Sequence, residues 1–132
     1  MRPSSETTIG VRLLQVSVVY LVGGLVLGLA MGISSNFSLM TVHSHLLLLG
    51  WSSMAVIGIV YLVMPGCARS RLATLHFWGH NLGLPIMMAS LALEAYGQKD
   101  IEPIIGTGST LVLVSLSLFA INLFRNGRLD RP

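Results

Sequence analysis

Residues 39–64 read LMTVHSHLLLLGWSSMAVIGIVYLVM, and this stretch decides the fold class of the chain. It contains no Asp, Glu, Lys or Arg. An α-helix needs about 20 consecutive, mostly apolar residues to cross the hydrocarbon core of a bilayer. The stretch therefore predicts a membrane-spanning helix.

Three further apolar runs flank this one, at residues 11–33, 72–96 and 104–124. The connections between the four runs are short and rich in turn-forming and capping residues: Ser34-Ser35-Asn36, Pro65-Gly66, and residues 97–103. Short connections make consecutive helices antiparallel neighbours. We therefore expect an all-α fold, a four-transmembrane-helix antiparallel bundle that forms a single domain over residues 1–132.

The composition agrees with a membrane protein and excludes several functional classes. Of the 132 residues, 53% are hydrophobic and 10% are charged, against about 25% charged in a typical soluble domain. The basic residues lie only at the ends of apolar runs, so they form no nucleic-acid-binding face. A single cysteine, Cys67, excludes an internal disulfide, a thiolate cluster and a covalent CxxCH haem attachment.

The basic residues also orient the predicted bundle. Seven arginines lie before the first run, between the second and third, or after the fourth: Arg2, Arg12, Arg69, Arg71, Arg125, Arg128 and Arg131. The other side holds only Lys99, with acidic residues near it. By the positive-inside rule, both termini and the loop with Cys67 face the cytoplasm, in a bacterial-type cytoplasmic (inner) membrane. The first apolar run is longer than a signal-peptide core, so we expect it to remain in the protein.

All four histidines, His43, His45, His76 and His80, fall in or at the edge of the predicted spans. Any one of them can be explained by a hydrogen bond across the bundle, but four together favour ligation of a metal or cofactor. His76 and His80 are four residues apart and share a helix face. His43 and His45 point about 160° apart, so only one of them faces the bundle core.

Counting helical rise from the turn near Ala68 separates the two histidine pairs by roughly 15 Å along the membrane normal. This spacing predicts two separate ligand-binding sites, or a single site that a second subunit completes. Because His76 is about one turn into its span, beside Trp78, we expect it to be a solvated interfacial residue. His80 is deeper and is the stronger ligand candidate.

Glycine and methionine residues allow two interpretations each. Gly24, Gly28 and Gly32 form overlapping GxxxG repeats, and Gly79 and Gly83 form another. They predict either close helix–helix approach or a slot for a flat macrocycle. Several methionines at the depths of the histidines are either soft ligands or ordinary packing: Met40, Met54, Met87 and Met88.

Motifs for other chemistries do not occur in the sequence. There is no HExxH zinc-hydrolase spacing and no glycine-rich phosphate loop that ends in lysine. No carboxylate pair lies in the middle of a span, since Glu94 is within a turn of the outer end. These observations disfavour a metalloprotease, a nucleotide-binding protein and a proton-coupled transporter.

Two stretches resemble a known family. Residues 41–51, TVHSHLLLLGW, followed by Gly58, Tyr61 and Pro65, are similar to the HxHLxxLGW…G..Y…P pattern of small proteins related to subunit I of haem-copper oxidases, including the nitric oxide reductase branch. Residues 75–83, LHFWGHNLG, resemble the HFW and WxHNxG patterns of that group. The resemblance covers about a third of the chain.

The resemblance implies a histidine on the second helix that ligates a b-type or a-type haem, a role that falls on His43 or His45. The large subunits have twelve or more spans and further histidines. A complete oxygen-reducing centre is therefore not expected in this chain, and His76 and His80 have no counterpart among the known ligands.

We expect a membrane haem protein that holds non-covalent haem b through His43 or His45, with His80 and His76 as further ligand candidates and copper as a second candidate metal. Electron transfer with a quinol or redox partner, or binding of NO or O₂ in respiration, would follow from such a haem. The GxxxG repeats predict a homo-oligomer. Two alternatives remain open: a metal or haem transporter or chaperone, and a structural or assembly subunit of a respiratory complex.

Overall fold

A computed structural model describes residues 5–128, with side chains from residue 8 onward. Arg2 and Arg131, which support the predicted orientation, lie outside the described residues. The described chain forms helices and no strands. Its order is α1 (Ser5–Ser34), α2 (Met40–His45), η1 (Leu46–Ser53), α3 (Met54–Val63), α4 (Pro65–Ala68), α5 (Arg71–Ala95) and α6 (Glu102–Asn126).

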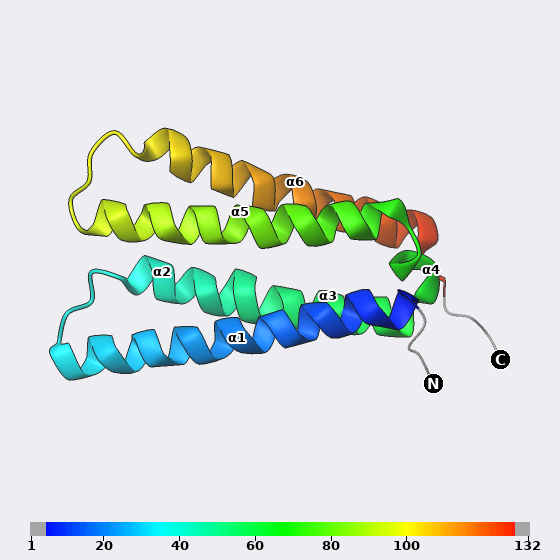
Figure 1. The fold of residues 1–132 in the computed structure, drawn as a ribbon, viewed down its shortest axis with the longest axis horizontal. Coiled ribbons are helices and arrows are strands. Elements are labelled where there is room, and N and C mark those ends of the chain that lie inside the picture. The colour runs from blue at the N-terminus through cyan, green and yellow to red at the C-terminus, as the bar shows by residue number, and fades with distance from the viewer. Residues whose placement is uncertain (1–4, 129–132) are drawn as a thin grey trace.

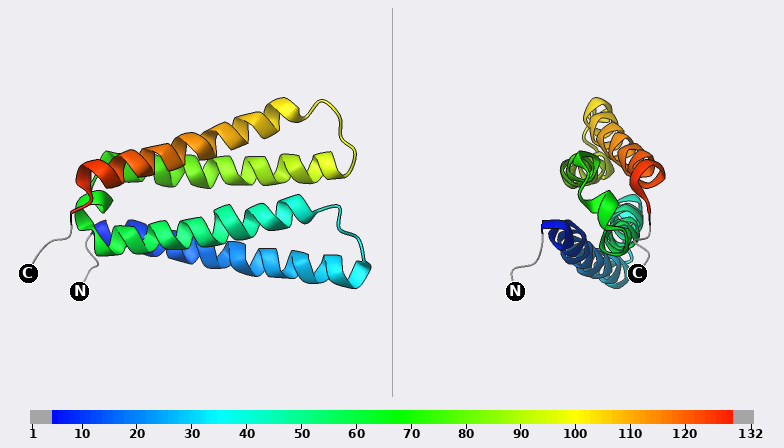
Figure 2. Two further views of the ribbon diagram at one scale, coloured as in Figure 1. Left: turned by 180° about the vertical axis from the view of Figure 1, so that it is seen from behind. Right: turned by 90° about the vertical axis from the view of Figure 1, so that its right-hand side faces the viewer.

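The helices form four long rods, because α2, the π-helical segment η1 and α3 follow one another without a break. Figure 1 shows two helical hairpins that lie side by side: α1 pairs with the α2–η1–α3 rod, and α5 pairs with α6. The end-on view in Figure 2 separates these two pairs clearly. Contacts within each hairpin far outnumber the contacts between the two hairpins.

Local sequence signals set the ends of the rods. Ser70 caps α5 by accepting a hydrogen bond from the Leu72 amide at 3.1 Å. Gly97, at a φ of +85°, follows the end of α5 in a left-handed conformation that glycine adopts without strain. Proline lies in the first turn of both α4 and α6, where its missing N–H costs no helical hydrogen bond. The predicted runs at 11–33, 39–64, 72–96 and 104–124 thus correspond to the four rods, and the observed helix α1 begins earlier.

Three rods are long and apolar enough to cross a membrane: Thr8–Ser34, Met40–Val63 and Glu102–Asn126. The fourth long helix, α5, has 25 residues but carries two histidines and an asparagine, and it falls outside that set. Large apolar side chains lie on the outside of the bundle, and Phe124 is the extreme case at 91% exposed. Polar residues such as Asn122 are buried. This distribution is the opposite of that in a soluble domain and is typical of a membrane protein.

In each hairpin, a pair of glycines lies where the two helices cross. A Cβ on Gly58 would lie 3.0 Å from the Gly10 carbonyl oxygen, where α3 crosses α1. A Cβ on Gly108 would lie 2.6 Å from the Met87 backbone nitrogen and 3.0 Å from the Gly83 carbonyl oxygen, where α6 crosses α5. Side chains larger than hydrogen would separate these backbones, so glycine permits the close approach.

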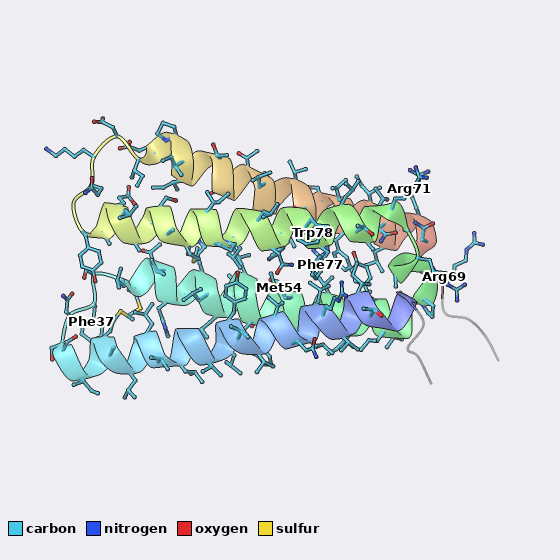
Figure 3. All side chains as sticks on the ribbon, in the orientation of Figure 1. Phe37, Met54, Arg69, Arg71, Phe77 and Trp78 are labelled. Atoms are coloured by element: carbon cyan, nitrogen blue, oxygen red, sulfur yellow. The ribbon has the colours of Figure 1, made fainter. Side chains whose placement is uncertain are left out.

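The charged ends of the bundle are visible in Figure 3. Arg69 and Arg71 lie at the end where α1 begins and α6 ends, and Phe37 lies at the opposite end. The loop with Lys99 and Asp100 joins α5 to α6, at the end that holds Phe37. Within the described residues, arginine is therefore concentrated at one end of the rods.

Candidate functional site

The inner histidine pair lies on the face of α5 that packs against the other hairpin. His76 and His80 both have 0% exposed surface, and their ring centroids are 5.6 Å apart. The predicted shared face is therefore confirmed. The prediction that His76 is a solvated interfacial residue is wrong, because Tyr61 and Phe119 cover it, while its neighbour Trp78 is 57% exposed.

Aromatic rings from two other helices lie against His76. Tyr61 on α3 and Phe119 on α6 lie with their ring centroids 5.9 Å and 5.7 Å from the His76 ring, and 5.8 Å from each other. The Tyr61 hydroxyl is 3.3 Å from His76 Nδ1 and also hydrogen-bonds the Asn122 side chain. His76 therefore lies in an apolar cage with one polar contact.

Asn122 extends this polar contact to the turn between the hairpins. Its Nδ2 donates to the Cys67 carbonyl oxygen at 3.0 Å, and its Oδ1 accepts from Asn126 at 2.8 Å. Cys67 is fully buried, with its thiol 3.8 Å from the Asn122 carbonyl oxygen. Burial raises the pKa of the Cys67 thiol. Residues from α3, α4, α5 and α6 thus form one hydrogen-bonded network.

His80 contacts the main chain of the facing rod. Its Nε2 donates to the Leu49 carbonyl oxygen at 3.1 Å. Leu49 lies within η1, the eight-residue π-helical segment. In this segment Ser53 Oγ also donates to the carbonyl oxygen five residues earlier, that of Leu48, at 2.9 Å. Short π-helical segments inside α-helices often occur at functional sites.

One ring nitrogen on each of the inner histidines has no hydrogen-bond partner among the described residues. These atoms are His76 Nε2 and His80 Nδ1, and both are buried. Buried polar atoms in folded proteins are almost always paired, so each unpaired one calls for an explanation such as a water or an ion. The two atoms belong to rings whose centroids are 5.6 Å apart.

The outer histidines take opposite directions from α2, as their spacing predicts. His43 Nδ1 donates to the Gly24 carbonyl oxygen of α1 at 2.9 Å, and its ring lies against Gly28. His45 Nδ1 donates to the Thr41 carbonyl oxygen of its own helix at 2.8 Å. In both cases Nε2 keeps its lone pair. His45 is half-buried and remains accessible from outside the bundle.

The first GxxxG repeat accommodates side chains of the neighbouring rod. A Cβ on Gly28 would lie 2.7 Å from His43 Cε1, and one on Gly24 would lie 2.6 Å from Leu47 Cδ2. Gly32 has no atom that close. Of the two interpretations, close helix approach describes this repeat. The space at Gly28 holds the His43 imidazole itself.

The outer histidines bond α1 and their own helix, whereas the inner pair contacts Tyr61, Phe119 and the Leu49 carbonyl. Across residues 5–128, no three His, Cys, Asp or Glu side chains come together as a metal-binding group. Met54, Met87 and Met88 are buried in the hydrophobic core, while Met40 is exposed. The methionines of the core therefore pack as apolar side chains.

Sequence reasoning missed the partners of the inner pair. Tyr61 entered only as part of a motif, and Phe119 and Asn122 were not singled out. An asparagine in an apolar run is a signal for Asn122, since a buried amide needs partners. No sequence pattern indicates the Leu49 carbonyl as a partner of His80. A main-chain acceptor inside a helix becomes available to a side chain only through a change in helical geometry, here the π-helical segment.

An apolar groove of about 320 Å³ lies next to this cluster. Its walls come from η1, α3 and α6: Ser52, Ser53, Val56, Ile57, Leu116 and Phe119. Phe119 therefore separates the groove from the His76 ring.

No protein-family profile, curated protein or solved structure matches this chain.

Proposed function

We propose that the chain crosses a bacterial-type inner membrane four times, with both termini in the cytoplasm. Three rods have the length and composition of membrane spans. The fourth, α5, has 25 residues, enough for about 37 Å of helix, and its histidines and asparagine are covered by the other rods or by its own backbone. Arginine at one end of the bundle supports the orientation.

We propose further that the protein binds non-covalent haem b through a histidine of α2. The observation that carries this proposal is the state of the outer imidazoles. His43 and His45 each donate Nδ1–H to a backbone carbonyl, at 2.9 Å and 2.8 Å, so Nε2 is left as the ligating atom. Metal-bound histidines generally have this arrangement, because the carbonyl fixes the tautomer and the orientation of the ring.

The residues present would hold a haem through one imidazole from each chain. His43 is held between α1 and α2 by Gly24 and Gly28, whereas His45 is accessible at the outer face of α2. We therefore favour His45 as the ligand. A histidine from a second copy of the chain would help to hold the same haem, which agrees with the proposed homo-oligomer.

A bound haem would supply one-electron chemistry or binding of NO or O₂. The chain contributes the imidazole and the backbone acceptor that orients it. The groove beside Phe119, with Ser52 and Ser53 at its edge, supports a quinol as the redox partner.

Absorbance tests the haem proposal directly. The full chain is purified in detergent from haem-replete cells, and reduced-minus-oxidised spectra and the pyridine haemochrome are recorded. His45→Ala should remove or strongly change the haem bands, and His43→Ala should change them less. Trp78→Ala, which alters an exposed aromatic side chain of α5, is the control. A colourless wild-type protein, or unchanged spectra for both histidine variants, would refute haem ligation from α2.

A structural or assembly role is the second candidate. His43, His45 and His80 each bond a backbone carbonyl, which is the arrangement that interhelical or intrahelical hydrogen bonds alone would require. A colourless protein that copurifies with a respiratory complex would favour this role. Selective loss or gain of a metal across vesicles would instead favour a transporter or chaperone.

A further inference from the structure

A pocket of about 180 Å³ lies between α1 and α5. Each helix contributes three lining residues: Thr8, Ile9 and Arg12 from α1, and Thr74, Phe77 and Trp78 from α5. Figure 3 shows Phe77 and Trp78 in the half of the rods nearer to Arg69 and Arg71. We call that end of the rods the arginine end. The pocket shares no lining residue with the groove beside Phe119.

Helical spacing brings these residues together. Thr8 and Arg12 are four residues apart on α1, and Thr74 and Trp78 are four residues apart on α5, so each pair occupies one face of its helix. Both helices run in the same direction from the arginine end (Figure 1). Arg12 lies seven residues after the first residue of α1, and Trp78 lies seven after the first residue of α5. Both are therefore about 10 Å into their helices.

This depth corresponds to the lipid headgroups. The apolar span of α1 begins at Thr8, so Arg12 is about one helical turn from its start. An arginine this close to the end of a span extends its side chain toward the headgroups, and tryptophan is enriched at the same interface. Arg12 and Trp78 are both exposed, so a lipid beside the bundle can reach the pocket.

The charge of the pocket is positive. Among the described residues that line it, Arg12 is the one with a charged side chain. The acidic residues with described side chains lie at the opposite end of the rods: Glu94, Asp100 and Glu102. Glu6 and Asp130 are outside the described side chains. A guanidinium presents a planar fork of donors that matches two phosphate oxygens, and the Thr74 hydroxyl can donate to the same group.

We propose that this pocket binds the phosphate of an anionic phospholipid of the phosphatidylglycerol type. Basic pockets between membrane helices at the cytoplasmic side bind anionic headgroups, and a single arginine suits a lipid with a single phosphate. The volume is that of about six water molecules, which leaves room for a phosphodiester but not for acyl chains. Occupation of the pocket rests on the proposed membrane insertion and is independent of haem.

Exposed apolar residues continue from the pocket toward the middle of the rods. Val19 lies seven residues after Arg12 and is 70% exposed, and Leu82 lies four residues after Trp78 and is 57% exposed. Both spacings keep these residues on the helix faces that line the pocket. The acyl chains of a bound lipid would cover them, and a free phosphate ion would not. This apolar continuation favours a lipid as the occupant.

Quenching of Trp78 fluorescence tests the site. The chain has two tryptophans, so a Trp51→Phe background leaves Trp78 as the sole reporter. The full chain is reconstituted into vesicles of phosphatidylglycerol and phosphatidylcholine, in which one of the two lipids carries bromine on its acyl chains. The ratio of the two quenching constants gives the enrichment of phosphatidylglycerol beside Trp78, and we expect it to be about fivefold. At about 1 M salt the Debye length is about 3 Å, so diffuse attraction is screened, and most of the enrichment should remain.

Variants identify the group that selects the lipid. Arg12→Gln should reduce the enrichment to about onefold, and Arg12→Lys, which keeps the charge without the planar fork, should give an intermediate value. Arg125→Gln is the matched control, because it removes the same charge from α6 at the same end of the rods, and it should behave like the wild type. Circular dichroism shows whether each variant is folded.

Equal enrichment in the wild type and in folded Arg12→Gln, or its loss from the wild type at high salt, would overturn the site and leave only diffuse attraction. Equal quenching by the two lipids in the wild type would overturn the choice of an anionic lipid. Displacement of brominated phosphatidylglycerol by excess inorganic phosphate would make the site one for a free anion. Enrichment in a protein that lacks haem bands would support the lipid site while refuting haem binding alone.

Discussion

His80 Nε2 lies 3.1 Å from the carbonyl oxygen of Leu49, so a side chain of α5 is bonded to the main chain of the opposite hairpin inside η1. The two hairpins have few contacts with each other, so a single buried hydrogen bond is a considerable part of their interface. It also requires the π-helical segment and the histidine to keep their relative positions.

The first prediction concerns the stability that this bond provides. His80→Ala removes the bond and leaves a cavity beside a buried carbonyl. We expect the free energy of unfolding to fall by about 2 kcal/mol, combining a hydrogen bond of about 0.6–1.7 kcal/mol in a membrane protein with the lost packing. Unfolding in detergent with increasing denaturant, followed by circular dichroism, measures the change. His45→Ala, which affects a bond within one helix, should change it by less than about 0.5 kcal/mol. Equal losses in both variants would contradict this view of the interface.

The second prediction compares two glycines on α6. Gly108→Ala places a methyl group 2.6 Å from the Met87 backbone nitrogen, so α5 and α6 must separate. We expect a loss of about 2–3 kcal/mol from overpacking. Gly106→Ala meets no atom within 4 Å, and its better helix propensity should stabilise the protein by up to about 1 kcal/mol. The same unfolding assay distinguishes the two, and a neutral Gly108→Ala would argue against the close crossing.

The third prediction is a pH dependence of stability that arises from Cys67. Burial raises the pKa of its thiol above the ordinary value of 9.0. A raised pKa in the folded protein means that the folded state binds the proton more tightly. The resulting stability is fully present below pH 9 and is lost as the pH rises through the folded-state pKa. Cys67→Ala should lack this decline above pH 9, measured as the free energy of unfolding. Slow alkylation of the native thiol at pH 8 is a second expected result.

The fourth prediction tests the orientation, and it needs cysteines other than the buried Cys67. In a Cys67→Ala background, Gln98→Cys lies in the loop between α5 and α6, and Arg128→Cys follows α6 at the opposite end. Both positions are exposed. A membrane-impermeant maleimide should label Gln98→Cys in intact cells and Arg128→Cys only after the membrane is opened. The reverse pattern would place both termini outside.

The helical rods could be predicted from the sequence because each one is an apolar run bounded by turn residues. The shared face of His76 and His80 was equally predictable, since helical spacing alone determines it.

Two features of the site could not be predicted for physical reasons. The burial of His76 depends on how α3 and α6 bring Tyr61 and Phe119 over it, and nothing in the local sequence of α5 encodes that contact. The π-helical geometry of residues 46–53 has no periodicity signal in a uniformly apolar stretch. The acceptor of His80 therefore depends on the three-dimensional fold and not on the local sequence.

The glycine crossings have a consequence for biogenesis. Each hairpin packs closely along its own glycine pair, Gly10 with Gly58 and Gly83 with Gly108. In a four-span topology, the first hairpin can enter the membrane during synthesis before the second has been translated. The helix α5, which is less apolar than the other rods, would then partition into lipid together with α6 as one unit. The histidines of α5 would find their partners only when the two preformed halves dock.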